Sequence, residues 1–79
     1  MDIRQCLGRN IRRLREAKGL SQEKFAFEAR IHRTYISDIE RGARNPTITI
    51  VQRLADALGV TASDLLTGVE ASANQIGGG

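Results

Sequence analysis

The sequence has one cysteine, Cys6, so no disulfide bond can form within the chain. A chain of 79 residues without a disulfide bond is typical of a reducing compartment, which indicates the cytoplasm. No apolar run approaches the roughly 20 residues that span a bilayer, and residues 1–5 lack the apolar segment of a signal peptide. We therefore expect a soluble cytoplasmic protein without a membrane partner.

Aromatic residues are also scarce, at 4% of the chain, and tryptophan is absent. Leu, Ile, Val and Ala must then build the core, and such cores suit helices packed on helices. No stretch alternates apolar and polar residues in the way that a half-buried strand does. The sequence predicts an all-α fold.

The residue types that build catalytic and metal sites are few and scattered. The single histidine, His32, lies far from Cys6 in the sequence, so the two offer neither a metal site nor a catalytic dyad. The glycines at 77–79 precede no helix and do not form a phosphate-binding loop. Asp38 and Glu40 are not spaced to share a helix face. We expect no enzyme activity, no cofactor and no small-molecule effector.

Basic residues are unevenly placed along the chain. Residues 1–44 hold eleven of the twelve Lys and Arg and six of the nine acids, a net charge of +5, whereas residues 45–79 carry a net charge of −2. This asymmetry favours one side that faces a polyanion. An ordinary solvated helical surface gives the same pattern, so the charge alone does not decide.

The hydrophobic spacing predicts five short helices joined by short turns. The first begins near Ile3 and ends near Lys18, because Gly19 follows as a natural stop. The second follows a Ser21 N-cap and ends near Ala29 or Arg30. The third covers residues 33–41 and ends at Gly42.

The C-terminal part of the sequence predicts two further helices. Thr47 caps a fourth helix that ends at Gly59, and Thr61 caps a short fifth helix that contains Leu65 and Leu66. Residues 1–68 then form one domain, a compact five-helix bundle, and we expect residues 69–79 to be a flexible tail.

Residues 21–42 form the informative unit, which is a helix, a short turn and a second helix. Two helices joined at a steep angle form a helix-turn-helix, whose second helix can enter the major groove of DNA. The first turn of that helix presents Arg33, which can donate two hydrogen bonds to guanine, and Thr34, which can contact a base edge. Tyr35 flanks the groove, where its hydroxyl can reach a phosphate. The alternative is an ordinary helical hairpin in a small bundle.

Residues 7–66 resemble the XRE-type helix-turn-helix family, which contains phage repressors, Cro and related bacterial regulators. The shared runs read LGRNIRRLREAKGLSQEKFA, then HRTYISDIERGARNPTI, then LADALGV. The resemblance implies the fold of the lambda-repressor DNA-binding domain. Within the family, Arg-Thr-Tyr at 33–35 and Arg44-Asn45 resemble the controller proteins of restriction–modification systems, although regulators of other operons share them.

The resemblance also implies roles for individual positions. Arg33 and Thr34 would read bases, and an ion pair between Arg15 and Glu40 would fix the recognition helix against the body. The other implied DNA-binding positions, which would cap helices, contact phosphates or lie further along the groove, are Ser21, Gln22, His32, Tyr35, Ser37, Asp38, Arg41, Arg44 and Asn45.

Asp38 does not fit the basic character of its surroundings, because a carboxylate in the groove repels phosphate. It can accept a hydrogen bond from cytosine N4, or it can hold Arg33 or Arg41 in a useful conformation, since both lie within helical reach. We favour the second hypothesis.

A single recognition helix reads only about four to five base pairs, and related proteins solve this with two-fold symmetry. We expect a homodimer whose interface includes Ile50, Ala62, Leu65 and Val69. The alternative is that these side chains only close the intramolecular core.

The sequence as a whole predicts a sequence-specific transcription regulator, either an activator or a repressor, that binds a near-palindromic DNA operator as a homodimer. The alternative function is an antitoxin-like or other protein-interaction module that uses the same fold. Binding that weakens steeply with salt would favour DNA, because each phosphate contact releases counterions.

Overall fold

The computed structural model describes residues 2–68, which form five helices and no strand. The helices are α1 (Ile3–Ala17), α2 (Gln22–Ala29), α3 (Arg33–Glu40), α4 (Ile48–Leu58) and α5 (Ala62–Leu65). The predicted all-α fold of five helices is confirmed. The predicted tail, residues 69–79, lies outside the described residues.

Local side-chain caps set the starts of the helices. The side chains of Ser21, Thr47 and Thr61 accept hydrogen bonds from backbone N–H groups in the first turns of α2, α4 and α5, as their positions in the sequence predicted. Asp2 caps α1 in the same way, through the N–H of Arg4 at 2.7 Å. The starts of four helices are therefore fixed by cap residues that bond to N–H groups two or three positions further along the chain.

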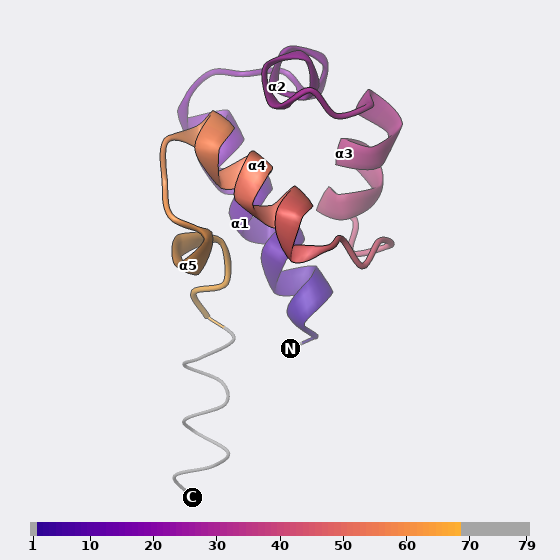
Figure 1. Ribbon diagram of the computed structural model, residues 1–79, viewed down its shortest axis with the longest axis vertical. Helices are drawn as coiled ribbons and strands as arrows, with labels where there is room; N and C mark the ends of the chain where they lie inside the picture. The colour runs from indigo at the N-terminus through magenta and orange to yellow at the C-terminus, as the bar shows by residue number, and fades with distance from the viewer. Residues whose placement is uncertain (1, 69–79) are drawn as a thin grey trace, which may run out of the picture.

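All five helices contribute buried side chains to one core, in which α1 packs against α3, α4 and α5, and α2 packs against α3 and α4 (Figure 1). Figure 1 shows α4 crossing α1, with α3 at one side of the pair and α2 seen nearly end-on above them. The largest fully buried side chains are Ile11, Phe25, Ile36, Ile39, Leu54, Leu58 and Leu65.

The burial of Leu65 corrects one expectation from the sequence. Leu65 was expected at the surface between two copies of the chain, but its side chain is fully buried in the core of one copy. The short helix α5 places it inward, against α1 and α4. The side chain of Leu65 therefore packs beneath α5 and exposes no surface that a second copy of the chain could contact.

Gly8 allows α1 and α3 to approach each other closely. A Cβ atom at this position would lie 2.3 Å from the carbonyl oxygen of Ile39 and 2.8 Å from that of Glu40. Only glycine leaves room for the backbone of α3 at this distance. The last turn of α3 is thus seated directly on the first half of α1.

Hydrogen bonds from α1 hold the segment that follows α5. The side-chain amide of Asn10 donates to the carbonyl oxygens of Leu65 at 2.9 Å and Thr67 at 2.8 Å. The thiol of Cys6 donates to the Thr67 carbonyl as well, with a distance of 3.2 Å from sulfur to oxygen. The two ends of the described chain therefore lie side by side.

Candidate nucleic-acid interface

The helices α2 and α3 are joined by a three-residue turn, Arg30–His32. Arg30 adopts a left-handed conformation, with φ of 57°, which stops α2 abruptly. His32 then caps α3, because its Nδ1 accepts a hydrogen bond from the N–H of Thr34 at 3.2 Å. Nδ1 is occupied in this way, so Nε2 is the ring nitrogen left for a contact outside the protein.

The outer side of α3 carries exposed polar side chains over a buried apolar side. Ile36 and Ile39 are buried in the core, whereas Arg33 and Thr34 are exposed at the first turn. Among residues 2–68, no hydrogen bond or ion pair engages the Arg33 side chain. The first turn of α3 therefore presents a free guanidinium beside a free hydroxyl.

A buried ion pair fixes the last turn of α3. Glu40 accepts hydrogen bonds from Arg15 Nε at 2.7 Å and Arg15 Nη2 at 3.1 Å, and the two side chains are 4% and 10% exposed. Hydrogen bonding to Glu40 raises the pKa of Arg15 above its ordinary value. This is the pair of residues that the family resemblance implies, and its two-point geometry sets the rotation of α3 about its axis.

Two further hydrogen bonds extend this ion pair to α2. Arg15 Nη1 donates to the Leu20 carbonyl at 2.7 Å, and the side-chain amide of Gln22 donates to Glu40 Oε1 at 3.1 Å. One carboxylate therefore connects α1, α2 and α3. Gln22 was expected to contact phosphate; in the structure, one of its two amide hydrogens holds Glu40, which leaves the second free for that contact.

Asp38, near the end of α3, lies between two arginines on the more exposed side of the helix. It forms ion pairs with Arg41, three residues on, and with Arg44 in the following loop, where the distance from Nε to Oδ2 is 3.2 Å. The guanidinium of Arg44 also lies over the ring of Tyr35, 4.7 Å from its centroid. The two arginines hold the pKa of Asp38 below its ordinary value, with Arg44 contributing most.

Asp38 was expected to hold Arg33 or Arg41, and the structure pairs it with one of these two. Arg41 is a partner, whereas Arg33 is not. Arg44 takes the second place, and sequence reasoning had not paired it with Asp38. A helical periodicity does not extend past Gly42, so the spacing gave no signal for a partner in the loop.

The remaining predicted positions surround the same surface. The Ser21 hydroxyl is engaged as the cap of α2, at 3.0 Å from the Lys24 nitrogen. Ser37 is half-buried on α3, and Asn45 is exposed in the loop before α4. All the predicted DNA-binding residues therefore lie on α3, the start of α2 or the segments that flank α3.

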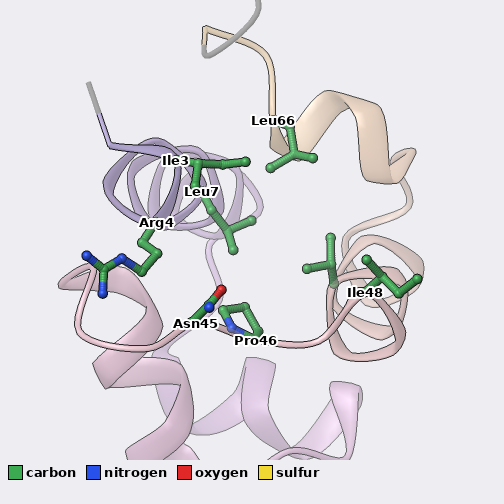
Figure 2. A pocket seen from close by; sticks show the side chains of 8 residues that line it. Ile3, Arg4, Leu7, Asn45, Pro46, Ile48 and Leu66 are labelled. Atoms are coloured by element: carbon green, nitrogen blue, oxygen red, sulfur yellow. The ribbon is translucent and has the colours of Figure 1, made fainter.

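A second surface, an apolar groove between α1 and α4, was only partly anticipated. Ile48 is 87% exposed at the first turn of α4. Leu7, Pro46 and Leu66 approach the groove from three sides (Figure 2). The other residues that line it are Ile3, Arg4, Asn45 and Val51.

Within residues 2–68, no cluster of three or more His, Cys, Asp or Glu side chains could hold a metal ion. None of the described helices is long and apolar enough to cross a membrane.

Comparison with known proteins gives consistent results for sequence and structure. The control protein C.BamHI of Bacillus amyloliquefaciens is 50% identical over 66 residues, which cover 82% of each chain. The restriction–modification controller protein C.AhdI from Aeromonas hydrophila has a TM-score of 0.76 at 40% identity, covering 78% of this chain and 94% of that one. The controller C.Esp1396I, solved as a tetramer with its natural 35 base-pair operator, has a TM-score of 0.75 at 32% identity, covering 82% and 86%.

A model of the helix-turn-helix family matches residues 11–65, which include every helix of the candidate interface and most of the core. This match confirms the resemblance that the sequence motifs indicated. The chain belongs to the helix-turn-helix family.

Proposed function

We propose that the protein is a transcription regulator that binds a DNA operator through α3. The observation that carries this proposal is the exposure of Arg33 and Thr34 at the first turn of α3, where their side chains have no partner among residues 2–68. Glu40 anchors the same helix from the protein side. A free guanidinium and a hydroxyl on a fixed helix are the groups that read base edges in the major groove. The operator complex of C.Esp1396I supports the same use of the fold.

The surrounding residues suit contacts with the phosphate backbone. At the N-terminus of α2, the backbone N–H groups of Gln22 and Glu23 have no partner among the described residues, and such a site favours phosphate. The side chains of Ser21 and Gln22 lie next to it. Further polar side chains follow the end of α3 and are placed to contact phosphates on the other side of the helix. They are Arg41, Arg44 and Asn45. Contacts on both sides would set the register of the helix, while the bases are read between them.

Selection of bound sequences from a pool of random DNA duplexes tests this proposal. We expect enrichment of a motif with two inverted half-sites whose centres are about 10 base pairs apart. A pool that stays random after repeated rounds would contradict sequence-specific binding. Retention of DNA that does not weaken with added salt would favour the protein-interaction alternative.

We also propose that the operator is bound by a homodimer. The surface that supports this is the face of α4 and α5 that joins the apolar groove, where Ile48, Ala62 and Leu66 lie together. Ile50, which was also expected at the interface, is half-buried, packs against the core and does not line this face. Val69, which was also expected there, lies outside the described residues. Sedimentation should show a dimer at micromolar concentration; a monomer at high micromolar concentration would oppose the proposal.

The identity of the regulated genes is a narrower proposal. Similarity to the control proteins C.BamHI and C.AhdI supports a controller of a restriction–modification system, acting on DNA in the cytoplasm. Specific binding upstream of restriction and modification genes next to its own gene would support this role. Binding only at operators of unrelated genes would leave the DNA-binding proposal intact and exclude the controller role.

A further inference from the structure

Three arginines lie on α3 or in the segment that follows it, and their contacts within the protein differ. Arg33 has no ion-pair partner among the described residues, whereas Arg41 and Arg44 share the carboxylate of Asp38. Asp38 is only 18% exposed, while Arg41 and Arg44 are 66% and 49% exposed. The carboxylate therefore lies beneath the two guanidiniums and holds both from the protein side.

We propose that Asp38 is a positioning residue that lowers affinity for non-specific DNA more than affinity for the operator. It does so by competing with backbone phosphates for Arg41 and Arg44. This inference rests on the proposed DNA-binding function and adds a specificity-determining residue to it.

Non-specific binding of DNA by proteins is electrostatic. Essentially all of that binding comes from cations that neutralise phosphates and release counterions. A guanidinium that is already paired with a carboxylate brings less of this gain, and the carboxylate itself repels the phosphates. Asp38 therefore reduces the charge available at a surface where, without it, Arg33, Arg41 and Arg44 would all bind any duplex.

On the operator, additional contacts can offset the loss of the ion pairs of Asp38, whereas non-specific DNA does not provide these contacts. On a matching sequence, Arg33 and Thr34 make base contacts that seat α3 in the groove. A seated helix brings phosphates to Arg41 and Arg44 at fixed positions, and the released Asp38 carboxylate can accept a hydrogen bond from a base amino group such as cytosine N4. Two gains that depend on sequence thus offset the loss of the ion pairs.

A purely structural role for Asp38 is poorly supported by the contacts. The end of α3 is already held by Glu40 and by backbone hydrogen bonds, including the one from the Ala43 nitrogen to the Asp38 carbonyl at 2.9 Å. Arg44 also has a contact with the ring of Tyr35 that does not involve the carboxylate. The pKa of Asp38 is lowered, so its charge persists throughout the pH range in which duplex DNA is studied.

The test is a salt titration of DNA binding by Asp38→Asn, with the selected operator and a scrambled duplex of equal length as probes. We expect affinity for the scrambled duplex to rise about 3- to 10-fold at low salt, because up to two exposed ion pairs are lost. The slope of log K against log salt should steepen by about 0.9 for each arginine released. Affinity for the operator should change less, so the ratio of the two affinities should fall.

Asp56→Asn is the matched control, because it removes the same charge from an exposed aspartate of α4 whose side chain bonds only to Gln52 among the described residues. The double variant Asp38→Asn/Arg44→Gln gives a second readout. Arg44→Gln should reduce the salt slope of non-specific binding by about 0.9 in the Asp38→Asn background, and by less in the wild-type background, where Asp38 already holds Arg44.

The possible outcomes are distinct. An unchanged slope and an unchanged affinity ratio in Asp38→Asn, with wild-type selectivity intact, would overturn the inference and leave the proposed function standing. A selective loss of operator binding would also overturn it, because Asp38 would then be a base reader alone. A wild-type protein without preference for any sequence would refute the proposed function, and this inference with it.

Discussion

At the scale of single residues, the two carboxylates of α3 have opposite surroundings and consequences. Glu40 is buried beneath the helix and connects α1, α2 and α3, whereas Asp38 lies beneath two exposed arginines at the edge of the proposed DNA-binding surface. A buried charge depends on its partner, because it has been removed from water. Exposed ion pairs contribute little to stability. We therefore expect Glu40 to control stability and Asp38 to control selectivity.

Replacing Arg15 with Ala should leave the Glu40 carboxylate buried without its cation. We expect the free energy of unfolding to fall by about 3–5 kcal/mol, as when one partner of a buried ion pair is removed. Urea unfolding followed by circular dichroism measures this loss. Arg12→Ala is the control, because its pair with Glu16 is exposed by 65% and 56% and should contribute at most about 0.5 kcal/mol. Equal losses in the two variants would show that the buried pair is not special.

The residue-scale features that could be predicted from the sequence were local. The caps Ser21, Thr47 and Thr61 each act on a backbone N–H group three positions away, a distance that sequence spacing fixes. The partner of Asp38 in the loop, Arg44, lies beyond the end of the helix, so no periodicity brings the two together. The inward position of Leu65 could not be predicted either. Its helix, α5, has only four residues, which are too few to show in the sequence which side is apolar.

At the scale of elements, the position of α3 is set by its contact with α1. Gly8 admits the backbone of α3, and Arg15, two turns further along α1, holds Glu40. The proposed recognition helix, α3, is therefore fixed at two points along one neighbouring helix. A shift at either point would tilt the exposed turn that carries Arg33 and Thr34.

Gly8→Ala should be destabilising, although alanine is the better helix former by about 1 kcal/mol. The added methyl would meet the Ile39 carbonyl oxygen at 2.3 Å, and overpacking of this kind costs about 1–3 kcal/mol. We expect both a lower melting temperature and weaker operator binding. Arg13→Ala, at an exposed position of the same helix, is the control. A melting temperature of Gly8→Ala above that of the wild type would contradict the close contact between α1 and α3.

The end of α2 shows a second limit of sequence reasoning. Helices commonly stop at a glycine, as α1 does before Gly19 and α4 at Gly59. In α2, Arg30 occupies the left-handed position with φ of 57°. The sequence therefore predicted the end of this helix only to within one residue, since no residue with a left-handed preference marked it.

Arg30→Gly should relieve the left-handed conformation, which costs an L-residue about 1–2 kcal/mol. Part of the gain is lost to the greater freedom of glycine in the unfolded chain. We expect a net stabilisation of up to about 1 kcal/mol, measured by thermal unfolding. Arg30→Val, which has a β-branched side chain, should be less stable than the wild type. The reverse order would refute the assignment of strain to Arg30.

At the scale of the whole molecule, the protein presents two different surfaces. One is polar and basic and is formed by α3 and the segments that flank it. The other is apolar and lies along α1, α4 and α5 around Ile48 and Leu66 (Figure 2). The all-α fold and the first of these surfaces could be predicted from sequence motifs. The second could not be located fully, because the exposure of Ile48 depends on how α4 is rotated against the core.

Ile48→Ser should weaken self-association about 10-fold or more, because each copy would lose an apolar side chain from the proposed interface. Sedimentation equilibrium measures this change. Phe27→Ser is the control, since Phe27 is also exposed but lies on α2, away from the apolar groove. A dimer that is weakened by Phe27→Ser and not by Ile48→Ser would place the interface on another surface.

The central claim is that the first turn of α3 reads DNA sequence. It is tested most directly by selecting duplexes from one random pool with the wild type, Arg33→Ala and Arg13→Ala in parallel. Arg13 is an equally basic residue that bonds to Asn10 on the α5 side of α1. We predict that Arg13→Ala selects the wild-type motif and that Arg33→Ala loses preference at one position of each half-site, by about 1–3 kcal/mol. An unchanged motif for Arg33→Ala would contradict the account.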